Sequence, residues 1–234
     1  MLAITFGNAF ASMNYEIHGA TLIATDRWLG LDWRAFSHFI HDDLHAGLAA
    51  TRIYVCFIPE PLIAIAILSL YGRVRVLNTL ILSWIIGLAI TMIVSGLYPS
   101  EPVYFLLGID ALSEFPDMKN DAGYGSWAIV EGFRHHQMSV LLDQPLTGFV
   151  SFPSFHAAGS VMITRAFWHL KNWRWPVAVL NTSIIFVTPF VGGHYFCDIL
   201  AGVLVGFLSY AAAKGIARFA HEPDPRPSAA TNGR

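Results

Sequence analysis

The sequence predicts an all-α fold: a polytopic helical bundle with about five or six transmembrane helices and an outer amphipathic segment. Of the 234 residues, 55% are hydrophobic and only 13% are charged, whereas the charged share of an average soluble protein is about 25%. Five apolar stretches approach the roughly 20 residues that a helix needs to cross a bilayer. Basic residues gather in alternate connections between these stretches, which is typical of a multi-pass membrane protein.

The N-terminal segment, residues 1–45, is only patchily apolar and lacks the basic region of a signal peptide. Its first 25 residues are therefore either a weak first span or a helix that lies on the membrane surface. His38, His41 and His45 would share one side of an α-helix, near Asp42 and Asp43. This pattern leaves a metal-binding face open as an alternative to an interfacial helix.

Residues 46–213 form the predicted membrane domain. Lipid offers the backbone no hydrogen-bonding partner, so each apolar stretch should be helical. Pro59 and Pro61 flank Glu60 inside the first stretch and predict a kink there. The third and fourth stretches are short, and tryptophans at the interface would have to complete them. The five expected spans are Ala46–Leu70, Val76–Tyr98, Phe155–Leu170, Pro176–Val191 and Tyr195–Ala213.

Lysine and arginine residues predict the orientation. Basic clusters follow the first, third and fifth spans, all on one side of a five-span arrangement. By the positive-inside rule this side faces the cytoplasm. The outer loop, residues 99–150, holds seven acidic residues and two basic ones, which agrees with the opposite side. Residues 214–234 are rich in Pro, Ser and Ala near their end, and we expect a disordered cytoplasmic tail.

Two histidines 38 positions apart stand out, because each lies in a short polar motif at the end of an apolar stretch. The chain between them should cross the membrane and return, so that both reach the outer face. In the first motif, Pro153-Ser154-Phe155-His156, proline suits a helix start and the free amides of the first turn suit an anion such as phosphate. Ser154 would add a hydroxyl donor, and His156 an acid or a base.

The second motif, Gly192-Gly193-His194-Tyr195, is followed by Asp198, four residues after the histidine. At this spacing His194 and Asp198 are neighbours on a helix. The carboxylate can accept the Nδ1–H, which leaves Nε2 as a nucleophile or base. The two glycines would leave space for a bulky group to approach. A structural His–Asp pair that ties two helices together is the alternative, but ionisable groups inside a membrane favour a functional reading.

Both motifs resemble the second and third signature motifs of the type-2 phosphatidic acid phosphatase superfamily. Gly-Gly-His-Tyr, followed by Ala201-Gly202, looks closest to the inositol phosphorylceramide synthase (inositolphosphotransferase)-like branch. The resemblance implies a membrane lipid phosphatase or phosphotransferase that needs no cofactor and no metal. It also implies that His194 attacks phosphorus to form a phosphohistidine, that His156 protonates the leaving alcohol, and that Asp198 orients His194.

The chain departs from the superfamily pattern in its cations. The first signature motif, a lysine followed by Arg-Pro, is absent, and so is the arginine that normally precedes the later histidine. The inositol phosphorylceramide synthase-like branch also lacks the arginine before the later histidine. Since a phosphoryl group in transfer carries negative charge, we expect Arg134 to bind it, unless Arg134 is only a surface charge on an amphipathic loop helix. The remaining expected substrate-binding residues are Ser154, Gly192, Gly193 and Tyr195.

The expected partners are a lipid phosphoester substrate and the surrounding membrane lipids. A net charge of only −2 gives no sign of nucleic-acid binding. Water or an alcohol could accept the phosphoryl group, so hydrolysis and head-group transfer are both open. A non-catalytic lipid-binding or transport protein and a metal-dependent membrane hydrolase remain alternatives. The site is expected to face the periplasmic or otherwise extracytoplasmic side.

Overall fold

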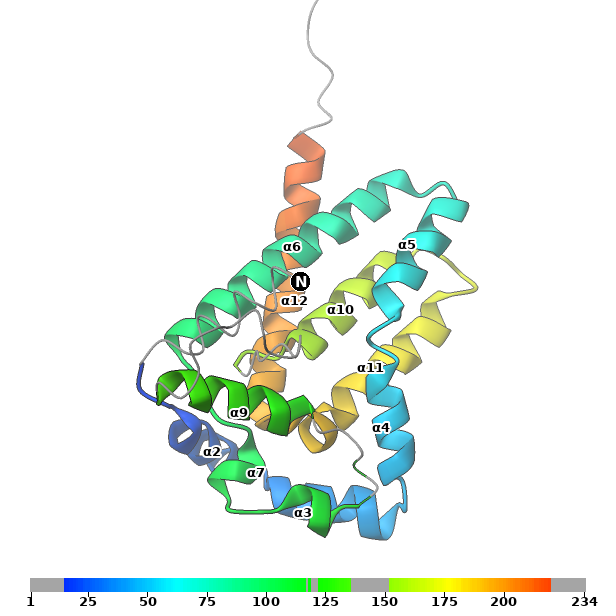
Figure 1. Cartoon of the computed structure of the whole chain (residues 1–234). Coiled ribbons are helices and arrows are strands. Elements are labelled where there is room, and N and C mark those ends of the chain that lie inside the picture. The colour runs from blue at the N-terminus through cyan, green and yellow to red at the C-terminus, as the bar shows by residue number, and fades with distance from the viewer. Residues whose placement is uncertain (1–14, 117, 119–121, 136–151, 220–234) are drawn as a thin grey trace, which may run out of the picture.

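The computed structural model describes residues 15–116, 118, 122–135 and 152–219 (Figure 1). Every secondary-structure element in these ranges is a helix, which confirms the predicted all-α class. Three predictions from the sequence fall partly or wholly outside these ranges: the first residues of the N-terminal segment, the end of the outer loop and most of the C-terminal tail.

Three helices in the described part of the chain are long and apolar enough to cross a membrane: α6 (Val74–Leu97), α11 (Arg174–Gly192) and α12 (Phe196–Phe219). The pair α4 (Gly47–Val55) and α5 (Glu60–Leu70) passes the same test together, with a bend of 51° between the two helices. The break confirms the predicted kink, since Pro59 caps α5 and Pro61 lies in its first turn.

The predicted third span is shorter than a bilayer. Its helix, α10 (Phe155–Phe167), has 13 residues and is therefore about 20 Å long, against roughly 30 Å of hydrocarbon. It begins where the sequence predicts but ends before Leu170. Most of α10 is buried, and it packs against α6, α11 and α12. This helix is the centre of the bundle rather than a lipid-facing span.

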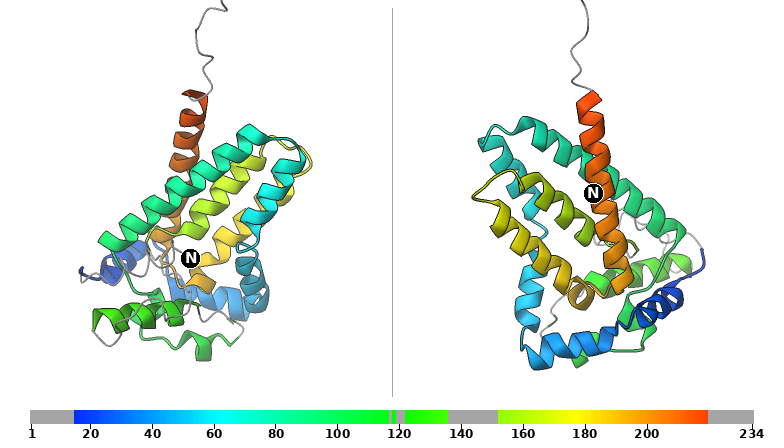
Figure 2. Two further views of the ribbon diagram at one scale, coloured as in Figure 1. Left: turned by 45° about the horizontal axis from the view of Figure 1, so that its top comes forward. Right: turned by 180° about the vertical axis from the view of Figure 1, so that it is seen from behind.

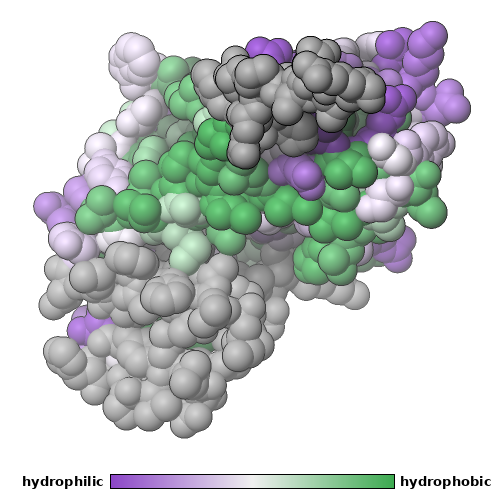
Figure 3. All heavy atoms as spheres, turned by 90° about the horizontal axis from the view of Figure 1, so that it is seen from above, coloured by the Kyte–Doolittle hydropathy of each residue, from purple (hydrophilic) through white to green (hydrophobic). Residues whose placement is uncertain are grey.

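The outer surface of the bundle is apolar. Leu62, Ile85, Val179 and Leu204, on four different helices, are between 58% and 72% exposed. Figure 3 shows hydrophobic residues in a broad band across the visible face, with hydrophilic residues toward its edges. Exposed apolar surface on this scale belongs in lipid, so the protein is a multi-pass membrane protein.

A layer of short helices closes one end of the bundle in all three ribbon views (Figures 1 and 2). The N-terminal segment contributes α2 (Gly19–Trp28), α3 (Trp33–His38) and a π-helical turn, η1 (Phe39–Asp43). The outer loop contributes α7 (Val103–Leu106), α8 (Ala111–Glu114) and α9 (Ala122–Arg134). Aromatic side chains join this layer to α11, and the Trp33 indole donates a 2.7 Å hydrogen bond to the Pro189 carbonyl.

Candidate functional site

His194 and Asp198 form a buried pair where α11 gives way to α12. Gly193, with a left-handed φ of 65°, ends α11 and turns the chain. Asp198 Oδ2 then accepts hydrogen bonds from His194 Nδ1 at 3.2 Å and from the Tyr195 amide at 3.1 Å. The two side chains are 7% and 1% exposed. The two side chains meet as predicted, although His194 lies in the turn before α12 and not on the helix itself. The contact leaves Nε2 of the imidazole available for chemistry.

His156 lies in the first turn of α10, where its imidazole contacts two aromatic rings. Its imidazole stacks on Tyr54 at 4.3 Å and lies 4.4 Å from the Phe57 ring, centroid to centroid. The Tyr54 hydroxyl is 3.4 Å from Nδ1. The sequence analysis missed Tyr54, because nothing in an apolar stretch marks one tyrosine as a partner of a histidine 102 positions away.

The structure brings the two histidines together around Tyr54. A Cβ atom built on Gly192 would lie 2.8 Å from His194 Cδ2 and 3.0 Å from the Tyr54 hydroxyl, so both groups converge on one point. The predicted return of the chain to the same end of the bundle therefore places His156 beside His194.

Close packing between α10 and α12 sets this arrangement. A Cβ on Gly202 would lie 2.2 Å from the Ser154 carbonyl oxygen, and one on Gly206 would lie 2.5 Å from that of Ala158. Small residues four positions apart let helix backbones approach this closely in membranes. The Ser154 amide then donates a 3.1 Å hydrogen bond to the Asp198 carbonyl, which links the two motifs directly.

Ser154 is the N-cap of α10. Its hydroxyl oxygen accepts a hydrogen bond from the Ala157 amide at 3.5 Å, and the residue is fully buried. The amides of Phe155 and His156, which precede Ala157, have no acceptor among the residues that the structure covers. Two unpaired N–H groups beside a histidine can receive an anion.

A carboxylate from another helix accepts hydrogen bonds from the first amides of α12. Asp26, on α2 and only 2% exposed, accepts hydrogen bonds of 2.8 Å from both the Phe196 and the Cys197 amides. A carboxylate at a helix N-terminus also interacts favourably with the helix dipole. Asp26 therefore holds the turn that presents His194. An aspartate in a patchy N-terminal segment carried no sequence signal for this role.

We expect Asp26→Asn to destabilise the protein. An amide offers one acceptor oxygen for two N–H groups, and leaving a buried donor unpaired costs about 1–3 kcal/mol. The melting temperature in detergent should fall. Asp43→Asn, at an exposed position, is the control and should leave the melting temperature unchanged. Equal behaviour of the two variants would contradict a structural role for Asp26.

The two glycines make room for side chains of this chain. Gly192 accommodates His194 and Tyr54, while a Cβ on Gly193 would lie 2.3 Å from the Tyr104 ring. These contacts explain why both positions lack a side chain. An approach of substrate to the same positions stays a prediction.

Tyr195 points away from the histidines, toward α2. Its hydroxyl and Glu101 Oε2 would each lie 2.5 Å from a Cβ on Gly19, and the ring is 1% exposed. Burial, followed by the negative charge of Glu101, raises the pKa of the Tyr195 phenol far above its usual value. The predicted contact of Tyr195 with substrate stays a prediction.

Arg134 ends α9, within the layer of short helices, and donates a 2.7 Å hydrogen bond to the Tyr15 carbonyl. None of the hydrogen bonds described for the two histidines involves it. The binding of phosphate by Arg134 therefore stays a prediction.

The N-terminal histidines engage carboxylates rather than one another. His38 Nδ1 lies 2.6 Å from Asp42, and Nε2 lies 3.2 Å from Glu114, which Arg34 also binds through two 3.0 Å hydrogen bonds. The π-helical turn and the left-handed φ of 48° at His45 break the continuous α-helical side that the spacing assumed. Among the described residues, no three His, Cys, Asp or Glu side chains are placed to hold a metal ion.

Fold and site together define a class: a polytopic helical membrane protein with a His–His–Asp cluster at one end of its bundle, in which His194 and Asp198 are buried and His156 is partly buried. The chain belongs to the PAP2 superfamily, whose family model matches residues 20–212. Membership implies a phosphatase-type activity on a phosphoester substrate. Comparisons with curated proteins and with solved structures found no significant match.

Proposed function

We propose that the protein is a membrane enzyme that removes or transfers the phosphoryl group of a lipid-like phosphoester through a covalent intermediate on His194. The buried contact between His194 Nδ1 and Asp198 is the observation that carries this proposal. It fixes the tautomer in which Nε2 holds a lone pair, the form that a nucleophilic imidazole requires. The PAP2 match supports a phosphoester as the substrate.

The first half-reaction breaks the ester bond. The lone pair on His194 Nε2 attacks phosphorus, the P–O bond to the alcohol breaks, and the electron pair leaves with that oxygen. His156 gives its proton to the departing oxygen. Asp198 stabilises the positive charge that develops on the His194 ring. The products are the free alcohol, phosphohistidine and a deprotonated His156.

In the second half-reaction the acceptor regenerates the enzyme. A water or alcohol oxygen attacks the phosphohistidine, and its proton passes to His156. The P–N bond then breaks, and its electron pair returns to Nε2. Water gives free phosphate and an alcohol gives a new phosphoester. The Gly-Gly-His-Tyr motif supports an inositolphosphotransferase-like enzyme, for which the acceptor is an alcohol.

The phosphoryl oxygens are best accommodated at the start of α10. The amides of Tyr195, Phe196 and Cys197 already donate to carboxylates, so the α12 terminus has little left to offer. The unpaired amides of Phe155 and His156 lie beside the acid instead. We assign the countercharge to Arg134, from the layer at this end (Figure 1). The site would face the extracytoplasmic side, as the positive-inside rule indicates.

Product analysis tests the proposal. Purified protein is incubated with labelled phosphatidate, phosphatidylinositol or ceramide plus phosphatidylinositol, with and without added alcohols. Free phosphate identifies a phosphatase, and a new phospholipid or phosphosphingolipid identifies a transferase. If none of these lipids is turned over by the folded protein, the proposed lipid phosphoester activity is wrong.

Tyr54→Phe should lower kcat about fivefold while KM changes little. The substitution keeps the ring that stacks on His156 but removes the hydroxyl near Nδ1, and one hydrogen bond is worth about 1 kcal/mol. Tyr54→Leu should be slower still, because it also loses the stack. Tyr71→Phe is a control: its hydroxyl contacts Trp173, away from the histidines, and kcat should not change. A Tyr54→Phe enzyme with wild-type kcat would show that the hydroxyl does not position His156.

A further inference from the structure

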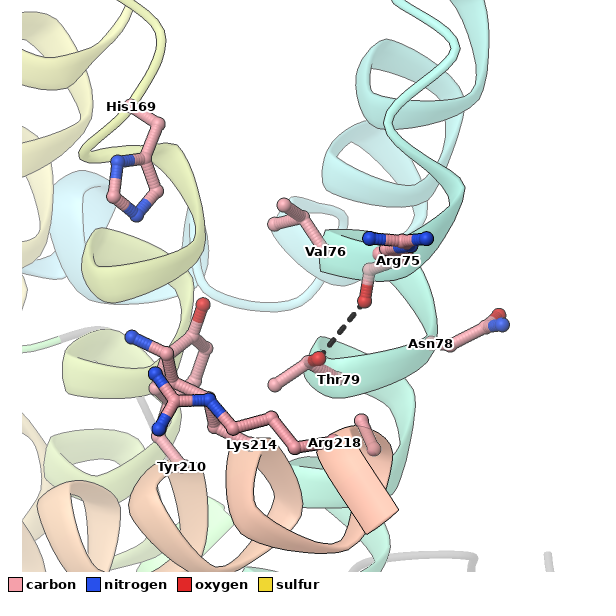
Figure 4. A pocket seen from close by; sticks show the side chains of 9 residues that line it. Arg75, Val76, Asn78, Thr79, His169, Tyr210, Lys214 and Arg218 are labelled. Atoms are coloured by element: carbon pink, nitrogen blue, oxygen red, sulfur yellow. Dashed lines mark hydrogen bonds between the residues drawn. The ribbon is translucent and has the colours of Figure 1, made fainter. Parts of the chain in front are cut away.

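A basic cleft lies at the end of the bundle opposite the histidines. It has a volume of about 340 Å³ and opens between the beginning of α6, the residues after α10 and the end of α12. In Figure 4 the polar ends of Tyr210, Lys214 and Arg218 gather on one side of the cleft. His169 and Arg75 approach from two other segments. Three separate parts of the chain thus build one concave site.

The cations of this cleft have no acidic partner in the described part of the protein. Every ion pair among the described residues involves Arg34 or a histidine of the opposite end, and the side chains of Arg75, Lys214 and Arg218 form none there. The hydrogen bond drawn in Figure 4 lies within α6, where the Thr79 hydroxyl donates to the Arg75 backbone carbonyl. The Arg75 guanidinium takes no part in it. Three positive side chains around one cavity favour an anionic occupant.

The surroundings of the cleft belong to a membrane interface. Val74 on α6 and Ile216 on α12 are 60% and 52% exposed beside it. Trp168 and Trp175, at the same end of α10 and α11, are also exposed and pack edge to face at 5.7 Å. Exposed tryptophans next to apolar helix surface are typical of the depth of lipid headgroups. An anion that reaches this cleft from the bilayer would therefore be a headgroup.

We propose that this cleft binds the phosphodiester headgroup of an anionic phospholipid, in the leaflet opposite the histidine site. Arg75 and Arg218 bind the phosphate from facing helices, and Lys214 adds a third charge. Val76 and Ala217, which also line the cleft, contact the beginning of the acyl chains. The cleft volume of about 340 Å³ lies at the lower end of the range for small-molecule sites, about 300 to 1,000 Å³. A volume of this size suits a headgroup rather than a complete lipid.

The test measures binding of dioctanoyl phosphatidylglycerol to the full chain in an uncharged detergent, by calorimetry and by the rise in melting temperature. The cleft variant carries Arg75→Gln, Lys214→Gln and Arg218→Gln. A control variant carries Arg73→Gln, Lys171→Gln and Arg174→Gln, which remove three charges from the same end outside the cleft. Each basic residue near a lipid surface contributes about fivefold to affinity, so the cleft variant should bind at least tenfold more weakly. The control should lose less than threefold.

Three results would overturn the proposal. Equal loss in both variants would show that the whole positive end, not the cleft, attracts the lipid. Equal affinity for dioctanoyl phosphatidylcholine would show that the negative headgroup is not recognised. Equal affinity for glycerol phosphate would make a soluble anion the ligand. If the triple variant does not fold, Arg218→Gln alone, at the helix end, should still lower affinity at least threefold, and an unchanged affinity counts against the cleft.

Discussion

His194→Asn should lower the rate of phosphate release by about 10⁴-fold or more, a loss of the size seen when enzymes lose a covalent nucleophile. Asparagine can still donate a hydrogen bond to Asp198, so the turn that links α11 and α12 keeps its main contact. What disappears is the lone pair on Nε2 that attacks phosphorus. The measurement is phosphate or phospholipid release under saturating substrate, with the melting temperature as a check on folding.

The matched control is His45→Asn. His45 is exposed in the layer of short helices and has a left-handed φ of 48°, a conformation that asparagine tolerates. The same substitution there should leave activity unchanged. A second measurement traps the intermediate: wild-type protein quenched during turnover of a phosphorus-labelled substrate should carry acid-labile, alkali-stable label, and His194→Asn should carry none. Wild-type turnover in a folded His194→Asn protein would exclude His194 as the nucleophile.

Gly202→Ala should cause the largest loss of stability. Its Cβ would lie 2.2 Å from the Ser154 carbonyl oxygen, which is backbone and cannot rotate away. Helices α10 and α12 would have to separate, and strain of this kind costs about 3 kcal/mol at the upper end of its usual range. For a chain of this size the melting temperature should fall by about 6–12 °C. Activity should fall with it, because the hydrogen bond between the Ser154 amide and the Asp198 carbonyl crosses the same contact.

Gly215→Ala is the control for this prediction. Gly215 lies on the same helix, and a Cβ there would meet nothing within 4 Å. Alanine favours a helix by up to about 1 kcal/mol over glycine, so the melting temperature should stay the same or rise. If Gly202→Ala melts like Gly215→Ala, the close approach of α10 and α12 does not exist.

Hydropathy predicted correctly which segments form helices but was less accurate about where the helices end. It predicted helices in all five apolar stretches, and the Pro-Glu-Pro sequence correctly located the break between α4 and α5. It overestimated α10, because a helix buried among other helices is as apolar as one that faces lipid. Its real end depends on packing at Trp168 and Leu170, which composition does not reveal.

The sequence by itself determined the local chemistry of the site. A histidine four residues before an aspartate in the first turn of a helix lies close to it, and two antiparallel helices joined by a short turn bring His156 and His194 to one end of the bundle. Only the tertiary structure decided what holds these groups. Tyr54, Asp26 and the Gly202 contact act across gaps of about 50 to 170 positions in the chain. Such partners are chosen by how helices pack, and packing depends on shapes in three dimensions that no local pattern of residues records.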